Sequence, residues 1–259
     1  MTVYQPFESG SWRGIHHRDF VVPGGDLDEW LGHIGATASR QRVSRWIASP
    51  GKDCPWFVKV LTAASEHDSL WNRLKWRMRS SRMLHTWQIS QDLQASGFIC
   101  PEIQLAARKR TWRPLGWPTD VLVMSPIDGQ PIPELLQGKP PQEILGTIAK
   151  ELARFHSAGF VHGDCIPGNL FLQAGGHLAF IDNDRTMRTS FWDRTARIRR
   201  NLVQFGFHLL LDKLASRTQL EDFFHEYMQS ANWLPAQRKH ELPRIWHWIE
   251  RRLANEPPK

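Results

Sequence analysis

The segment from residue 142 to residue 184 most restricts what this chain can fold into. Apolar residues recur at helical spacing over 142–157, which predicts an amphipathic helix that ends at Gly159. Two short apolar runs, 170–172 and 178–181, flank an Ala-Gly-Gly turn and predict a β-hairpin. Polar residues lie in the connections next to these elements: His162, Asp164, Asn169 and Asp182.

Three of these polar residues have the spacing of a catalytic loop for phosphoryl transfer. Asp164 is placed to orient an acceptor hydroxyl and to take its proton. Asn169 and Asp182 are placed to hold Mg²⁺ against the phosphates of ATP. His162 is expected to brace the turn rather than to act in catalysis. The set predicts an ATP- and Mg²⁺-dependent kinase.

A kinase also needs a lysine on an N-terminal strand that reaches the ATP phosphates. Lys59 fits this requirement, because it is a lone cation inside the apolar β run 56–61, after a strand expected at 43–48. The alternative for Lys59 is an edge-strand residue that faces solvent. Residues 32–37 contain two glycines and are either a phosphate-covering turn or a simple loop.

These motifs resemble the lipopolysaccharide core kinases, the Kdo/WaaP family of the protein-kinase-like superfamily. The resemblance covers roughly residues 30–212 and is most specific at 152–164, which enter the catalytic loop. Residues 181–185 are similar to the metal-site strand, with Asn183-Asp184 where protein kinases usually have Phe-Gly. The looser matches are 79–82, 95–101, 120–124 and 200–202.

The resemblance implies a two-lobed α+β protein-kinase-like fold. Residues 1–125 would form a small N-lobe, an antiparallel sheet plus helix that covers the nucleotide. Residues 126–259 would form a mainly helical C-lobe with the catalytic loop, the metal site and a helical scaffold. Backbone groups near Met124, Ser125 and Ile127 are expected to bind the adenine edge of ATP.

The chain departs from the kinase pattern in one respect. Kinases pair the strand lysine with a glutamate from the first N-lobe helix. The helix expected at 82–96 contains no glutamate, and the family position falls near Thr86. Gln88, Asp92 or Glu66 could substitute. A non-catalytic pseudokinase scaffold therefore remains an alternative.

The charge of the chain indicates an anionic partner. The formal net charge is +7, and the basic segment 71–82 contains Arg73, Arg77 and Arg79 together with two tryptophans. Arginine binds phosphate and tryptophan suits a lipid interface, so these three arginines are the candidate contacts to a lipid-linked anionic glycan at the inner leaflet. A solvated basic face is the alternative. No recognition motif for nucleic acid accompanies the charge, so no nucleic acid partner is expected. The other basic clusters are Arg108, Lys109, Arg110 and Arg113, and Arg185, Arg188, Arg194, Arg197, Arg199 and Arg200.

Length and cysteine usage agree with a kinase of the cytoplasm. The 259 residues are enough for two small lobes, and no apolar run reaches transmembrane length. No secretory signal is apparent at the N-terminus, and three dispersed cysteines suggest a reducing compartment. We expect a cytoplasmic enzyme, peripherally associated with the inner membrane, that phosphorylates a heptose or Kdo hydroxyl of the lipopolysaccharide inner core. A kinase of a protein or of a small soluble acceptor is the alternative enzyme.

Overall fold

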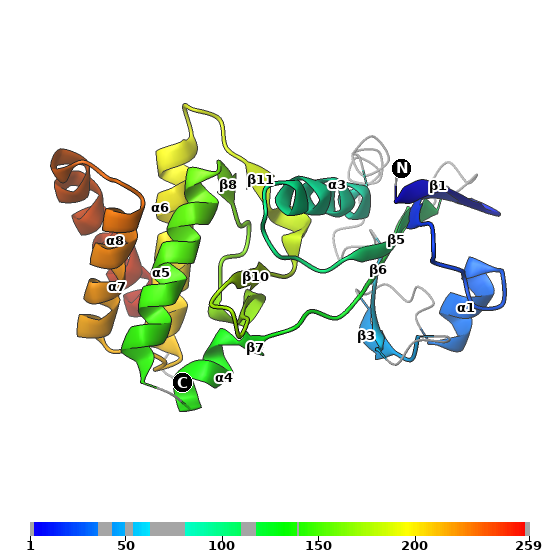
Figure 1. Ribbon diagram of the computed structural model, residues 1–259, viewed down its shortest axis with the longest axis horizontal. Helices are drawn as coiled ribbons and strands as arrows, with labels where there is room; N and C mark the ends of the chain where they lie inside the picture. The colour runs from blue at the N-terminus through cyan, green and yellow to red at the C-terminus, as the bar shows by residue number, and fades with distance from the viewer. Residues whose placement is uncertain are drawn as a thin grey trace. The chain divides into compact units, whose positions relative to one another are not determined.

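The computed structural model contains two compact units (Figure 1). The first unit comprises residues 1–91 and 101–127, and the second comprises 92–100 and 128–259. The residues that the structure describes are 3–35, 43–49, 54–62, 81–109, 118–138 and 140–256.

The first unit is built on a six-stranded antiparallel sheet in the order β1-β2-β5-β6-β4-β3. Its strands are β1 (Tyr4–Ser9), β2 (Trp12–His17), β3 (Val43–Ile47), β4 (Trp56–Thr62), β5 (Ile103–Lys109) and β6 (Thr119–Met124). Its helices are α1 (Leu27–His33) and α3 (Arg82–Ala95), and the last residues of α3 belong to the second unit. The hairpin β1–β2 was not predicted from the sequence.

Alternating side chains give the sheet two apolar faces, because successive residues of a strand point to opposite sides. Val58 and Val60 of β4 pack in one buried cluster with Trp30 of α1. The other face packs in a second cluster with Met83 of α3. Lys59 lies between the two valines, so its side chain points to the α3 face of the sheet.

The expected strands and helix of this unit are confirmed, but the glycine turn is not. The strands predicted at 43–48 and 56–61 correspond to β3 and β4, and the helix predicted at 82–96 corresponds to α3. Gly32 lies inside α1, whose C-cap is Ile34, so no phosphate-covering turn begins there. The remainder of that segment, from residue 36, lies outside the described residues.

The second unit contains most of the described helices. Its strands are β7 (Gln130–Pro131), β8 (Phe160–Val161), β9 (Leu170–Leu172), β10 (Leu178–Phe180) and β11 (Met187–Arg188). Its helices are α4 (Ile132–Gly138), α5 (Pro141–Ser157), α6 (Arg194–Leu211), α7 (Arg217–Ser230) and α8 (Pro235–Asn255), with short 3₁₀ turns η1 (Pro167–Asn169) and η2 (Asn183–Arg185).

Helix α5 forms where the sequence predicts it and supports the catalytic segment. Pro141 stands at its first position, where a missing N–H costs nothing, and Gly159 follows its end with φ 88°. The apolar face of α5 carries Phe155, which stacks on Phe180 of β10 with 4.1 Å between ring centroids. Phe98 packs edge-on against both rings. The end of α5 and the returning hairpin strand therefore share one aromatic core.

Two small pairs of antiparallel strands lie next to the turn that contains Asp164. The predicted hairpin is confirmed as β9 and β10, which pair in antiparallel register. Strand β11 pairs with β8, placing Met187 opposite Val161 and Arg188 opposite Phe160. Because β8 leads directly into His162, the residues after Asp182 are tied to those before Asp164.

The later helices pack through apolar residues at helical spacing. The buried residues of this kind are Ile198, Leu202, Phe205 and Leu209 in α6 and Leu220, Phe223, Phe224 and Tyr227 in α7. In α8, Ile245 and Ile249 are buried, whereas Leu242, Trp246 and Leu253 are only half-buried. Ser216 caps α7 through a reciprocal capping box with Gln219.

Candidate active site

The turn that carries Asp164 is fixed by a neutral histidine. His162 is fully buried, and its Nε2 lies 2.8 Å from the carbonyl oxygen of Ile181. Its Nδ1 accepts a hydrogen bond from the backbone N–H of Asp164, at 3.2 Å. A ring that donates from Nε2 and accepts at Nδ1 is the neutral tautomer. Burial lowers the pKa of His162, which agrees with this state. The expected bracing role of His162 follows from these contacts.

Asn201 of α6 hydrogen-bonds to the backbone of His162. Its Nδ2 donates to the carbonyl of His162 at 2.6 Å, and its Oδ1 accepts from the N–H of His162 at 2.8 Å. The Oδ1 also lies 3.1 Å from Nε2 of His156, a buried residue of the last turn of α5. His156 Nδ1 lies 2.7 Å from the hydroxyl of Tyr227 in α7. This buried network links three helices to the catalytic turn.

Asp164 itself is positioned by a glutamine that the sequence analysis missed. The Nε2 of Gln204 donates a short hydrogen bond to Asp164 Oδ1, and its Oε1 accepts from the N–H of Cys165 at 3.3 Å. Gln204 lies one helical turn after Asn201 on α6, so the two amides face the same loop. The signal in the sequence was two amide side chains at three-residue spacing in a helix whose other residues are mostly apolar or basic.

Asn169 and Asp182 lie on adjacent segments of backbone. The N–H of Ile181 donates to the carbonyl of Asn169 at 3.0 Å. Nδ2 of Asn169 donates to the carbonyl of Asp164 at 2.9 Å, which fixes the amide and leaves Oδ1 as the atom that can bind a cation. Asp182 has left-handed backbone angles, φ 55° and ψ 48°, an uncommon conformation for a residue other than glycine.

The donor chemistry of this pair fits Mg²⁺. Magnesium prefers oxygen ligands and usually takes one or two from protein, with phosphates and water completing its shell. One carboxylate and one amide oxygen match that pattern. Within the described ranges no group of three or more His, Cys, Asp and Glu side chains could hold a metal.

The residues after Asp182 pack against the catalytic turn. Asn183 is buried, donates to the carbonyl of Phe180 at 2.7 Å and accepts from the hydroxyl of Thr186 at 3.0 Å. Arg185 lies against Gly163, where an added Cβ would be 2.0 Å from the Arg185 Cβ and 2.3 Å from its carbonyl oxygen. Only glycine permits this approach, which holds the two segments together.

In the first unit, Lys59 is an interior residue of the sheet. Strand β4 lies between β3 and β6, with Lys59 opposite Ser44 and Leu122. The side chain is only 3% exposed. The edge-strand alternative is therefore wrong, since β4 has a partner on both sides.

The position expected for the helix glutamate is not available for pairing with a lysine. Thr86 of α3 is buried, and its hydroxyl donates to the carbonyl of Arg82 at 2.9 Å. Of the candidate substitutes, Gln88 is exposed, Asp92 bonds Arg188 at 3.2 Å, and Glu66 lies outside the described residues.

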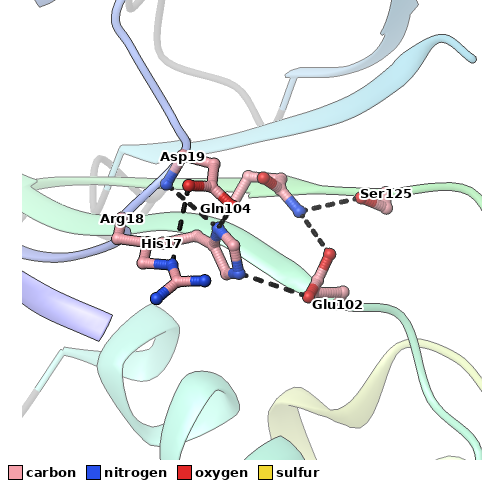
Figure 2. Close-up of polar contacts among 6 residues, drawn as sticks. All are labelled: His17, Arg18, Asp19, Glu102, Gln104 and Ser125. Atoms are coloured by element: carbon pink, nitrogen blue, oxygen red, sulfur yellow. Dashed lines mark hydrogen bonds and ion pairs between the residues drawn. The ribbon is translucent and has the colours of Figure 1, made fainter. Parts of the chain in front are cut away.

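The segment expected to bind adenine is braced by a buried amide (Figure 2). Gln104 is the extra residue of a β-bulge in β5 and is fully buried. Its Nε2 donates to Ser125 Oγ at 2.9 Å and to Glu102 Oε2 at 2.8 Å. The other oxygen of Glu102 lies 3.5 Å from His17 Nε2. The backbone N–H of Ser125 donates to the carbonyl of Glu102 at 2.9 Å, so this segment is held at both side chain and backbone.

Met124 and Ile127 bound that segment. Met124 ends β6 and is opposite both Phe57 and Ile103, with 8% of its surface exposed. Ile127 is half-buried and is the last residue of the first unit.

The basic clusters are more strongly paired than their sequence suggested. Arg108 forms a two-pronged ion pair with buried Asp120, at 2.7 and 3.0 Å, and Lys109 pairs with Asp28 at 2.7 Å. A solvated basic face is therefore wrong for Arg108, whose partner is buried, whereas the pair of Lys109 with Asp28 is exposed. In the third cluster the paired arginines are Arg188, Arg197 and Arg199, which contact Asp92, Asp193 and Glu241. The proposed substrate residues Arg73, Arg77 and Arg79 lie outside the described residues.

Cys165 directly follows the proposed base in the sequence. It is fully buried, and burial raises the pKa of its thiol to about 12. A buried thiol with a raised pKa does not favour a role as a nucleophile.

None of the helices in the described parts of the chain has the length and hydrophobicity that a bilayer crossing requires.

The comparisons with known proteins place the chain among kinases. The model of the Lipopolysaccharide kinase (Kdo/WaaP) family matches residues 51–227. The structure of WaaP in complex with acyl carrier protein is similar with a TM-score of 0.57 and 15% identity, over 82% of this chain and 84% of that chain. A 2.2 Å crystal structure of WbdD gives a TM-score of 0.47 and 17% identity, over 83% of this chain and 53% of that chain. No curated protein sequence matches the chain.

The structural similarity to WaaP supports the fold alone, because sequence identity is low, and it confirms the two-lobed α+β kinase-like fold expected from the sequence. The family match extends over more than half of the chain and includes Lys59, Asp164, Asn169 and Asp182. This chain belongs to the lipopolysaccharide kinase (Kdo/WaaP) family.

Proposed function

We propose that this kinase transfers the γ-phosphoryl group of ATP to a heptose or Kdo hydroxyl of the lipopolysaccharide inner core. The observation that carries the proposal is the set of hydrogen bonds that hold Asp164 in place. Its carboxylate accepts from Gln204, and the backbone on either side of it is held by neutral His162 and by Asn169. Such a carboxylate, held in one orientation on a rigid loop, suits a general base.

The proposed chemistry assigns one role to each predicted residue. The acceptor oxygen attacks the γ-phosphorus, the bond from that phosphorus to the β–γ bridging oxygen breaks, and ADP leaves. The acceptor proton passes to the carboxylate of Asp164. Mg²⁺, when bound with ATP, would neutralise phosphate charge between Asn169 and Asp182. Lys59 would reach the ATP phosphates from the first unit.

The adenine base is proposed to bind along residues 124–127. Ser125 already uses its N–H in the bond to Glu102, and Pro126 has no N–H. We therefore assign the donor for the adenine edge to the backbone N–H of Ile127. Met124 and Ser125 would border the base. The lobe division at residue 125 and the nucleotide-covering role of the sheet belong to the same proposal.

The acceptor is proposed to be an anionic glycan anchored in the cytoplasmic leaflet of the inner membrane. Recruitment by Arg73, Arg77 and Arg79 remains part of this proposal, motivated by the density of arginine and tryptophan in their segment. The enzyme would then work in the cytoplasm and associate peripherally with the membrane.

One experiment tests the proposed function directly. Purified enzyme is incubated with ATP labelled in the γ-phosphate, Mg²⁺ and purified core glycolipid, and transfer of label is measured. Free heptose and Kdo and a generic protein substrate are controls. Label in the glycolipid alone supports the proposal. Label mainly in protein or in free sugar would replace it with the alternative of a different acceptor.

A pseudokinase scaffold is the second candidate, and Thr86 is the observation that favours it. The hydroxyl at this position is bonded within its own helix, so it cannot orient Lys59 as a glutamate would. A scaffold would bind nucleotide without transferring label to any acceptor. Label transfer that depends on Asp164 would exclude this candidate.

A further inference from the structure

The connection between β11 and α6 presents two exposed aromatic side chains. Phe191 is 87% exposed and Trp192 is 91% exposed, and their rings meet edge-on with 5.5 Å between centroids. Figure 1 shows this connection in yellow between the labels β11 and α6. Single exposed apolar residues are ordinary on proteins, but two adjacent rings left in water form a patch that favours contact with another apolar phase.

Hydrogen bonds hold this connection in a defined conformation. Thr189 donates from its backbone N–H to the carbonyl of Gly159 at 2.7 Å, next to the β8–β11 ladder. Ser190 donates to Asp193 Oδ1 from its N–H at 3.0 Å and from its hydroxyl at 2.8 Å. Arg194 donates to the carbonyls of His156 and Ser157, at 2.9 and 3.0 Å. Both ends are anchored, so the rings project from a fixed base.

The residues around the rings are strongly basic. Residues 185–200 contain six arginines and one acidic residue, Asp193. Three of the six arginines contact carboxylates: Arg188 contacts Asp92, Arg197 contacts Asp193 and Arg199 contacts Glu241. Arg194 donates to two carbonyl oxygens, and neither of these acceptors carries a negative charge. The loop thus combines aromatic tips with an excess of positive charge at their base.

We propose that Phe191 and Trp192 insert into the headgroup region of an anionic bilayer while the neighbouring arginines meet lipid phosphates. Aromatic residues favour the membrane interface, and basic residues add attraction to anionic lipid. The proposal deepens the proposed function, on which it rests for the choice of a membrane as the place of work. Because β11 pairs with β8, a docked loop would be connected through this ladder to the strand that leads into the turn with Asp164.

A bilayer fits these features better than a protein partner does. The two rings are almost completely exposed, and the residues on either side of them, Ser190 and Asp193, are polar, so the apolar patch is limited to two side chains. A bilayer can surround a narrow projection without a matching groove, whereas a protein surface must supply one.

Vesicle flotation with the full chain tests the proposal. The vesicles are phosphatidylcholine alone or phosphatidylcholine with about 30% phosphatidylglycerol, at low and at raised salt. The test variant is Phe191→Ser with Trp192→Ser. The control variant is Trp46→Ser with Leu234→Ser, which removes one exposed aromatic and one exposed aliphatic side chain elsewhere, 58% and 70% exposed.

Wild type and control are expected to float with the anionic vesicles, and raised salt should weaken this binding. The test variant should bind at least about tenfold more weakly. Equal binding of test variant and wild type, or no binding of wild type, would overturn the proposal. Concentration-dependent dimers in gel filtration that the test variant abolishes would assign the rings to a second copy instead. Phosphorylation of detergent-dispersed glycolipid by wild type is measured in parallel. Transfer of label by a wild type that does not bind vesicles would refute only the docking loop, whereas absence of transfer would refute the proposed function.

Discussion

At the scale of single residues, the two aspartates of the site are predicted to have separable roles. Asp164→Asn and Asp182→Asn should each abolish turnover and leave the fold intact. Asp164→Asn should keep Mg-ATP binding, because the proposed partner of its carboxylate is the acceptor. Asp182→Asn should weaken Mg-ATP binding, because the proposed role of Asp182 is that of a cation ligand. Nucleotide titration with and without Mg²⁺ measures the difference. Equal affinity in both variants would show that the roles are assigned wrongly.

Gln204 is predicted to act through Asp164 as a positioning residue. Gln204→Glu keeps the shape of the side chain but replaces the donor to Asp164 with a second negative charge. We expect kcat to fall by about 10- to 100-fold, and the acid limb of its pH profile to move to higher pH, because a neighbouring anion disfavours ionised Asp164. The KM for ATP should change little. A lower kcat with an unshifted pH profile would indicate a merely structural role.

At the scale of elements, the contact between the catalytic turn and the segment after Asp182 is predicted to need glycine. Gly163→Ala places a Cβ 2.0 Å from the Cβ of Arg185 and should cost about 2–3 kcal/mol of unfolding free energy. Gly168→Ala in η1 is the matched control, since nothing lies within 4 Å of its added Cβ, and should change stability by less than about 0.5 kcal/mol. Urea unfolding compares the two. Similar stability of both variants would contradict the close packing of these segments.

At the scale of the whole molecule, buried histidines are predicted to make the fold sensitive to mild acid. Burial lowers the pKa of His156 from 6.5 to about 4, and also lowers that of His162. At a pH between 4 and 6.5, His156 is protonated in the unfolded chain but neutral in the folded chain. The free energy of unfolding is therefore highest above pH 6.5 and decreases as the pH falls toward 4.

The loss attributable to His156 between about pH 7 and about pH 4.5 is on the order of 2 kcal/mol. Urea unfolding of wild type and His156→Gln across this range measures it. The variant is less stable at neutral pH, but its stability should fall less steeply with acid. Parallel pH dependence in the two proteins would mean that His156 does not exclude the proton.

The sequence by itself determined the elements whose information is local. Helix α5 follows from apolar spacing, a proline at its start and a glycine after its end. The hairpin β9–β10 follows from two apolar runs and a glycine turn. These patterns are readable because the contacts that form each element join residues close in sequence. The spacing of Asp164, Asn169 and Asp182 along these elements is what predicted a kinase.

Only the tertiary structure decided the contacts between distant residues. Asn201 and Gln204 reach the catalytic turn from about forty positions downstream because α6 packs beside it. Arg108 looked like part of a solvated basic face until β5 and β6 paired and placed it beside Asp120. No local pattern specifies such partners, since they depend on which faces of distant elements meet. The same packing left Phe191 and Trp192 exposed.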